Sequence, residues 1–318
     1  LTMSFTVLAT PRSFAKNDDA PIRLLEEQGC TVIRLPMNGG DLQAQLLEQL
    51  PQADAVIAGL EPYTRSMLET AKNLKIISRY GVGYDKVDLE AAHAMGIKVS
   101  ITPGANSDSV ADLAMTLMLA AARNVCPMDA AIRAGGHDKP ITGVEMWNKT
   151  LGVVGTGRIG KGVIQRASGF QMKVLANDAY PDPAFVEAHN GKYVDLDTLF
   201  RESDFITLHA PLTEETRNMV DARRLAEMKP RAVLVNTARG IVDEDALYQA
   251  LKEGQIGAAA LDATVVEPAC GSPLASLPNC ILTPHAGAAT YEAGYNMGML
   301  AAQNVLDVLF GRECRFLV

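Results

Sequence analysis

The sequence predicts an α/β fold in which two doubly wound parallel sheets, each with helices on both faces, form two domains. Two observations predict it. Short apolar runs alternate with helical stretches along most of the chain, as a parallel sheet with crossover helices requires. The 318 residues, 48% of them hydrophobic, also suffice for two cores of ordinary size.

The first hundred residues contain five strand-like runs with helical stretches between them. No GxGxxG sequence occurs in this part, which is therefore expected to be a second α/β domain rather than a nucleotide-binding one. The expected strands are Phe5–Ala9, Thr31–Leu35, Ala55–Ala58, Lys75–Ser78 and Ile97–Ser100, and the expected helices lie near 20–28, 41–49, 64–71 and 88–95.

The segment 106–124 reads as one long helix. Ser109 followed by Asp112 resembles a capping box, and the residues after it are almost all alanine, leucine or methionine. A helix that is apolar on nearly every side is expected to be buried all round. It could bridge two domains, pack between two subunits, or be an ordinary core helix.

From residue 150 the alternation resumes. Strands are expected near 151–154, 172–176, 204–208, 231–235, 256–261 and 279–282. A last helix runs from Thr290 to Phe310, where Gly311 is well placed to end it, and it is expected to return to the first domain. The expected domains are 1–102 plus 290–318, and 103–289.

A glycine-rich turn, GTGRIG, follows the strand at 151–154 and opens a helix. Gly155 permits the tight turn, Gly157 lets a pyrophosphate approach the backbone, and Gly160 lets the helix lie close to the strand. Asp178 ends the next strand, where a carboxylate binds ribose hydroxyls and repels a 2′-phosphate. Residues 179–181 supply no cation for such a phosphate. This order of elements predicts a Rossmann domain that binds NAD rather than NADP.

Composition excludes several classes of function. The net charge of −8 argues against nucleic acid as a partner, and no apolar run is long enough to span a membrane. The N-terminus lacks the pattern of a signal peptide. The five cysteines are widely spaced without a CxxC motif, which favours a reducing, cytoplasmic setting and argues against a metal site.

Three candidate chemical groups each follow a strand of the second half: Arg239, Glu267 and His285. Ligands of open α/β sheets bind beyond the carboxyl ends of the strands, so the three side chains are expected to converge. An arginine binds a carboxylate through two parallel hydrogen bonds. A histidine exchanges a proton with a ketone or alcohol oxygen, and a neighbouring glutamate favours the protonated imidazolium form. This set suits hydride transfer on a 2-hydroxy or 2-keto acid.

Each of the three residues also has an ordinary interpretation. Arg239 could lie in a solvated turn, Glu267 in a surface loop, and His285 at a helix entry. Each ordinary interpretation is individually the commoner case. The shared position after a strand argues against three coincidences.

The whole chain resembles the D-2-hydroxyacid dehydrogenases, and among them the phosphoglycerate dehydrogenase-like members. The matching stretches lie in both domains, in the order and spacing of that family. They are SRYGVGYDKVDLEAA at 78–92, TPGANSDSVADLAM at 102–115, TLGVVGTGRIGKG at 150–162, HAPLTEETRNMV at 209–220, NTARGIVDEDAL at 236–247, GAAALDATVVEP at 257–268 and TPHAGAAT at 283–290.

The resemblance implies a flavodoxin-like substrate domain and a hinged cleft between it and the Rossmann domain. It implies that Arg239 holds the substrate carboxylate, His285 is the acid/base and Glu267 its partner. It also implies a homodimer built around 106–124. The backbone at Tyr80, Gly81, Val82 and Gly83 is implied to receive the substrate carboxylate. The implied NAD contacts, besides the three glycines and Asp178, are Arg158, Ile159, His209, Ala210, Pro211, Thr216, Thr237, Ala238, Arg239, Asp262 (on the nicotinamide amide), His285 and Gly287.

One departure concerns the substrate. Several phosphoglycerate dehydrogenases bind the substrate phosphate with arginines after the third strand, where this chain has AGLEPYT at 58–64. Glu61 would repel a phosphate dianion, for which Arg65 or Arg79 could compensate. Because the sequence ends at Val318, the regulatory domain of some phosphoglycerate dehydrogenases is not expected.

The expected function is therefore NAD-dependent dehydrogenation of a small 2-hydroxy acid, with 3-phosphoglycerate the first candidate. Hydroxypyruvate, glyoxylate or another short 2-keto acid is the alternative. An alternative of another class is an NAD(H)-sensing dimeric binding protein.

Overall fold

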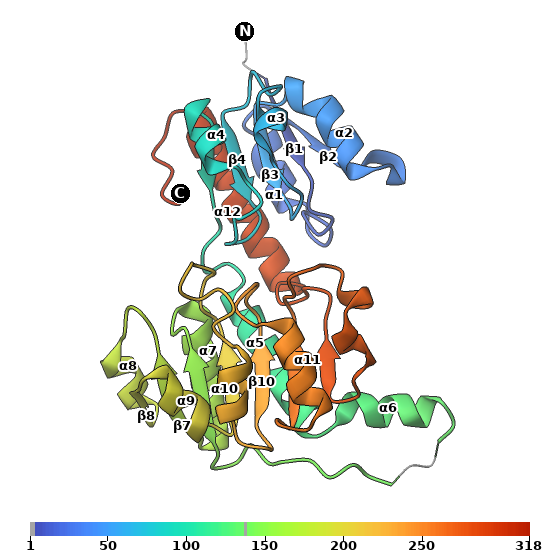
Figure 1. The fold of residues 1–318 in the computed structure, drawn as a ribbon. Helices are drawn as coiled ribbons and strands as arrows, with labels where there is room; N and C mark the ends of the chain where they lie inside the picture. The colour runs from blue at the N-terminus through green and yellow to red at the C-terminus, as the bar shows by residue number, and fades with distance from the viewer. Residues whose placement is uncertain (1–3, 137–138) are drawn as a thin grey trace. The chain divides into compact units, whose positions relative to one another are not determined.

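The structure is a computed structural model that describes residues 4–136 and 139–318. Its internal contacts divide the chain into two units, one formed by the residues up to Asn106 together with Ala288–Val318, the other by Ser107–Gly287. Each unit is built on one parallel sheet, of five and seven strands, so the predicted fold class is confirmed (Figure 1).

The sheet of the first unit has the strand order β2-β1-β3-β4-β5. All its strands are parallel. After β2 the chain crosses to the other side of β1 to form β3, so the strand order changes direction between β1 and β3, as in a flavodoxin-like order. The strands are β1 Phe5–Ala9, β2 Cys30–Arg34, β3 Ala55–Ala58, β4 Ile76–Arg79 and β5 Lys98–Ser100, and the helices are α1 Ala20–Glu26, α2 Leu42–Gln49, α3 Arg65–Leu68, α4 Leu89–Ala94 and α12 Tyr291–Leu309.

The C-terminal helix α12 packs against the first-unit sheet. Its buried residues Val305 and Leu306 belong to the same core cluster as Phe5, Ile57 and Ile76 of the strands. The helix begins where the Thr290 hydroxyl accepts a hydrogen bond from an amide of the first turn. Residues more than two hundred positions from these strand residues thus complete the core of this unit.

The sheet of the second unit has the order β12-β11-β10-β9-β6-β7-β8. The strand order changes direction between β6 and β9, which are parallel neighbours. In such folds a dinucleotide binds beyond the carboxyl ends of the strands at this point. The strands are β6 Thr150–Val154, β7 Lys173–Asn177, β8 Gly191–Tyr193, β9 Phe205–Leu208, β10 Val233–Asn236, β11 Ala258–Leu261 and β12 Cys280–Leu282.

Two apolar clusters cover the two faces of this sheet. One includes the helices α5 and α7, and the other includes α9, α10 and α11. Helices α5 and α7 lie close together at Gly162. A Cβ at this position would lie only 3.1 Å from the Cβ of Ala111. The helices are α5 Ser107–Ala122, α6 Val125–Arg133, α7 Arg158–Ala167, α8 Pro183–Ala188, α9 Leu196–Glu202, α10 Ala222–Glu227 and α11 Glu244–Lys252.

Helix α5 departs from the sequence-based expectation in two ways. It begins at Ser107, so Ser109 lies inside the helix and is not its N-cap. It is also not buried all round, since Asp112, Thr116 and Leu119 form an exposed stripe one turn apart. The short helix α6, which was not expected, projects from the side of this unit (Figure 1).

In the described part of the chain, no single helix is long and apolar enough to cross a membrane. Only α5 and α6 together, across a bend of 66°, meet that criterion of length and composition. All five cysteines are free.

Candidate active site

The candidate catalytic side chains come from three loops at the carboxyl edge of the second-unit sheet. Arg239 lies in the loop after β10, Glu267 in the loop after β11, and His285 in the loop after β12. These strands are neighbours and run in parallel, which brings the three loops to one edge.

The three side chains contact one another. The Nδ1 of His285 lies 2.9 Å from Oε1 of Glu267. The Nη2 of Arg239 lies 3.3 Å from Oε2 of Glu267 and 3.5 Å from Nδ1 of His285. Each Glu267 oxygen therefore faces a different basic partner, while the Nε2 of His285 has no hydrogen-bond partner among the described residues.

Glu267 is the anionic centre of this cluster. Burial disfavours its charged form, but the hydrogen bond with His285 and the charges of His285 and Arg239 outweigh that effect. The pKa of Glu267 consequently lies below its ordinary value. Glu267 is therefore a carboxylate at neutral pH, which can orient the imidazole and stabilise its protonated form.

His285 has an unusual backbone conformation, with φ of 53° in the left-handed region. For a residue with a side chain this costs about 1 to 3 kcal/mol, so surrounding contacts must hold it. The buried carboxylate of Asp262, the first residue after β11, supplies such contacts. Its Oδ1 accepts hydrogen bonds from the Thr283 hydroxyl (2.6 Å) and the Ala286 amide (2.7 Å), and its Oδ2 accepts one from the Gly287 amide (2.8 Å).

The glycine-rich turn fits a pyrophosphate. Gly155 has φ of 89°, and a Cβ there would lie 2.6 Å from the amide nitrogen of Ala210. A Cβ at Gly160 would lie 2.0 Å from the Gly155 carbonyl oxygen, whereas one at Gly157 would meet nothing within 4 Å. At Gly155 and Gly160 the turn is thus packed against backbone atoms, whereas at Gly157 it leaves open space for a ligand. Arg158 and Ile159 begin α7 there, without a side-chain cap on its first amides.

Asp178 follows β7 and turns back toward the glycine-rich turn. Its Oδ2 accepts hydrogen bonds from the Thr156 amide (2.5 Å) and hydroxyl (3.1 Å), and its Oδ1 accepts one from the Tyr180 amide (2.8 Å). Tyr193 of β8 joins the network, with its hydroxyl 2.7 Å from that of Thr156. The carboxylate thus stands beside the turn, where a ribose adjoins the pyrophosphate.

The loops after β9 and β10 are tied together by His209. Its Nε2 lies 2.8 Å from the Thr207 hydroxyl and its Nδ1 lies 2.8 Å from that of Thr237. Burial lowers the pKa of His209 to about 3, so the ring is neutral. Thr216 braces the next segment, since its hydroxyl donates to the Pro211 carbonyl at 2.7 Å. Ala238 follows Thr237 in the β10 loop, and its amide donates to Asn236 at 3.0 Å.

The loop Tyr80–Gly83 belongs to the first unit and follows β4. The buried Arg79 supports it, donating from Nε to the Gly83 carbonyl (2.9 Å) and from Nη1 to the Ala58 carbonyl (2.7 Å). Gly81 has φ of 148°, and its carbonyl accepts from the Thr102 amide at 2.9 Å. Val82 is exposed. Arg79 therefore holds the loop by its backbone.

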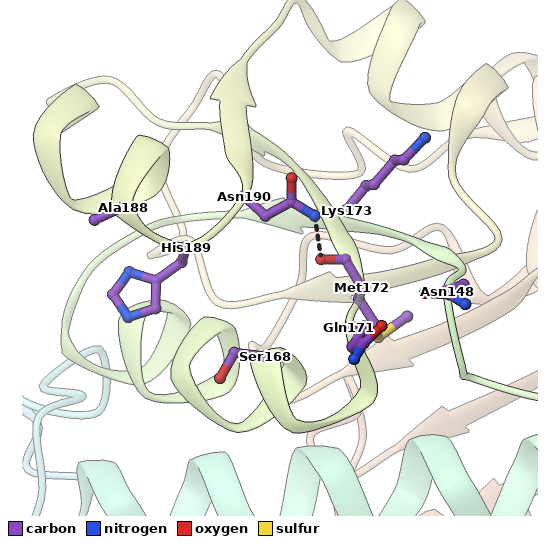
Figure 2. A pocket seen from close by; sticks show the side chains of 8 residues that line it. All are labelled: Asn148, Ser168, Gln171, Met172, Lys173, Ala188, His189 and Asn190. Atoms are coloured by element: carbon purple, nitrogen blue, oxygen red, sulfur yellow. Dashed lines mark hydrogen bonds between the residues drawn. The ribbon is translucent and has the colours of Figure 1, made fainter.

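A hollow in the second unit lies away from these residues. It is lined by side chains just before β6, β7 and β8, among them Asn148, Met172 and Asn190, whose Nδ2 donates to the Met172 carbonyl at 3.3 Å (Figure 2). The amino ends of parallel strands form the edge opposite the carboxyl ends. The hollow therefore contains none of the candidate site residues.

Sequence reasoning missed four residues that support the site: Thr156, Tyr193, Glu244 and Thr283. Glu244 begins α11 and accepts from the Val265 amide at 2.7 Å, which fixes the loop carrying Glu267. Thr156 and Thr283 lie inside the motifs GTGRIG and TPHAGAAT. Both could have been predicted as hydroxyl donors to the carboxylates expected nearby, Asp178 and Asp262. Tyr193 lies on a strand that had not been predicted.

Comparisons with known proteins agree with this geometry. Residues 115–287 match the family model described as D-isomer specific 2-hydroxyacid dehydrogenase, NAD binding domain. The chain is 44% identical over 299 residues to a D-3-phosphoglycerate dehydrogenase of Methanocaldococcus jannaschii, covering 93% of this chain but only 56% of that protein. It is also 44% identical over 271 residues to a glyoxylate reductase of Thermococcus litoralis, covering 82% of each chain.

A solved structure has the same fold. The TT0316 protein of Thermus thermophilus superposes with a TM-score of 0.88 at 38% identity, covering 98% of this chain and 99% of that one. With the family model and the relatives, this shows that the chain belongs to the D-isomer specific 2-hydroxyacid dehydrogenases, a family of NAD-dependent oxidoreductases that act on CH–OH groups.

Proposed function

We propose that this protein is an NAD-dependent enzyme that interconverts a short 2-keto acid and the corresponding 2-hydroxy acid. The observation that carries the proposal is the contact among Arg239, Glu267 and His285 at the carboxyl edge of the sheet. An NAD-sensing binding protein would need the cofactor turn but not this set of a carboxylate-binding cation, a proton donor and an anion beside it.

Each residue has one proposed task. Arg239 binds the substrate carboxylate with its guanidinium fork and orients the adjacent carbonyl. His285 gives a proton to the carbonyl oxygen during reduction and removes it during oxidation, using the Nε2 that is not engaged with Glu267. Glu267 orients the ring and stabilises the imidazolium. NAD, when bound, supplies or accepts the hydride. The backbone of Tyr80–Gly83 is proposed as the second contact for the substrate carboxylate.

The distal group of the substrate is proposed to be small and unphosphorylated, as in glyoxylate or hydroxypyruvate. Glu61 lies in the loop after β3, at the same edge of the first-unit sheet as Tyr80–Gly83. Its Oε1 accepts hydrogen bonds from the Gly59 amide (3.0 Å), the Tyr63 hydroxyl (2.6 Å) and the Thr10 hydroxyl. This anion opposes a phosphate dianion.

The two arginines that could compensate for Glu61 have other partners. Arg79 is buried against the Ala58 and Gly83 carbonyls, and Arg65 pairs with Glu90 at 3.7 Å. 3-Phosphoglycerate becomes the second candidate, favoured by the relative named for that activity.

The test is NADH oxidation with a panel of 2-keto acids that includes glyoxylate, hydroxypyruvate, pyruvate and phosphohydroxypyruvate. The proposal expects turnover, with higher kcat/KM for the first two than for the phosphorylated compound. NADH binding without turnover of any member would support the sensing function instead. Preference for phosphohydroxypyruvate would overturn the assignment of Glu61.

A homodimer is proposed through the second unit. Large apolar side chains are exposed on α5, on α6 and on the segment before β6, namely Leu119, Val125, Ile132, Ile141 and Trp147. Their exposure supports contact with a second copy of the chain. Sedimentation should give twice the monomer mass for the wild type, and Ile132→Asp should weaken the dimer. A monomeric wild type would contradict the proposal.

A further inference from the structure

We propose that Asp262 is a positioning residue that holds the His285 loop in its left-handed conformation. The inference rests on the proposed function, in which His285 exchanges a proton with the substrate and therefore needs a fixed position. It concerns the backbone of the loop, whereas Glu267 contacts the imidazole ring.

The hydrogen bonds to Asp262 lie on both sides of His285. The Thr283 hydroxyl donates from two residues before it, and the amides of Ala286 and Gly287 donate from the two residues after it. Because all three bonds end on one buried carboxylate, a change of the His285 backbone angles would break at least one of them. A buried carboxylate that loses such donors is strongly disfavoured. The arrangement therefore stabilises a conformation that the chain would otherwise avoid.

Packing around the carboxylate supports this role. A Cβ at Gly287 would lie 3.0 Å from Oδ2 of Asp262 and 3.1 Å from Cγ2 of Val110. The glycine thus lets its amide approach the carboxylate closely. The loop is pressed against α5 on one side and held by Asp262 on the other.

The expected contact of Asp262 with the nicotinamide amide is compatible with this role but secondary to it. A carboxylate offers about four acceptor positions. The loop uses two on Oδ1 and one on Oδ2, which leaves one position on Oδ2. Variants of Thr283 separate the two roles, because they weaken the clamp without altering the carboxylate.

The test compares Thr283→Val with Thr283→Ser. Valine keeps the shape and removes the donor, whereas serine keeps the donor. In the absence of substrate, hydrogen exchange of the Ala286 and Gly287 amides should be faster in Thr283→Val and near wild type in Thr283→Ser. The Kd for NADH should stay within about twofold in both variants. Since a displacement of about 1 Å can cost about 100-fold, kcat should fall about tenfold in Thr283→Val, with KM little changed.

Asp262→Asn provides the second variant. Its amide nitrogen cannot accept, so at least one loop donor loses its partner, and exchange of the same two amides should accelerate. Unchanged exchange in both Thr283→Val and Asp262→Asn would overturn the inference. Weaker NADH binding by Asp262→Asn with unchanged exchange would also overturn it, in favour of a cofactor role alone. Exchange and NADH binding require no turnover, so these results are independent of whether the proposed activity is found.

Discussion

Replacing Glu267 with glutamine tests the electrostatic part of the site. The substitution removes one negative charge and nearly keeps the shape, so that Arg239 and His285 face a neutral amide. Reduction requires protonated His285, and the imidazolium loses its stabilising neighbour while the guanidinium remains 3.5 Å away. The alkaline limb of kcat/KM for reduction should therefore move to lower pH. The acid limb for oxidation should move in the same direction, because one ionisation governs both.

The size of the effect follows from the contact. A hydrogen bond between charged groups contributes about 1.5 to 3 kcal/mol, and one pH unit corresponds to about 1.4 kcal/mol. The side chains of His285 and Glu267 are 37% and 25% exposed, so solvent screening favours the lower end of this range. We therefore expect Glu267→Gln to lower kcat/KM for reduction about tenfold on the alkaline side of the profile, with a smaller effect on the acid side.

The assay is a pair of pH profiles in each direction for the wild type and Glu267→Gln. Glu253→Gln is the matched control, since Glu253 is an exposed residue after α11 whose side chain, among the described residues, accepts a hydrogen bond from Gln255 alone. A primary isotope effect with deuterated NADH establishes that hydride transfer limits the rate. If both limbs stay in place under that condition, Glu267 does not act electrostatically on His285.

Three further variants test the remaining roles. His285→Gln should lower kcat by about 100- to 10,000-fold while NADH still binds, and near-normal turnover would place the proton donor elsewhere. Arg239→Lys should raise KM for the keto acid and lower kcat, reducing kcat/KM by about 10- to 100-fold; a change in NADH affinity alone would refute the anchor role. The wild type should bind NAD more tightly than NADP, and Asp178→Ala should narrow that difference, as titrations with both cofactors can show.

Much of the fold could be predicted because buried parallel strands are short apolar runs. The predicted strands at Phe5–Ala9 and Ala55–Ala58 agree with the structure to the residue. Strand β8 was missed because it is brief and carries the exposed Lys192 between Gly191 and Tyr193. The start of α5 was misplaced because Ser109 and Asp112, which both lie inside the helix, resembled a capping box.

The site was predictable where chemistry follows strand order. Arg239, Glu267 and His285 each lie in the loop that follows a strand, and neighbouring parallel strands bring these loops to the same edge of the sheet. Contacts that depend on backbone angles were not predictable. The φ of His285 and the three bonds to Asp262 arise from how the loop closes on the sheet, and spacing in the sequence does not encode them.

The imidazole of His209 has a consequence for the acid limit of this protein. Its pKa is lowered to about 3 in the folded chain, whereas an unfolded chain binds that proton near pH 6.5. Between these values the unfolded state holds more protons, so the free energy of unfolding falls as the pH falls, by at most about 1.4 kcal/mol per pH unit from this one group. Acid therefore favours release of His209 from the Thr207 and Thr237 hydroxyls, and the amide protection factors of the β9 and β10 loops should fall as the pH falls below about 6.5.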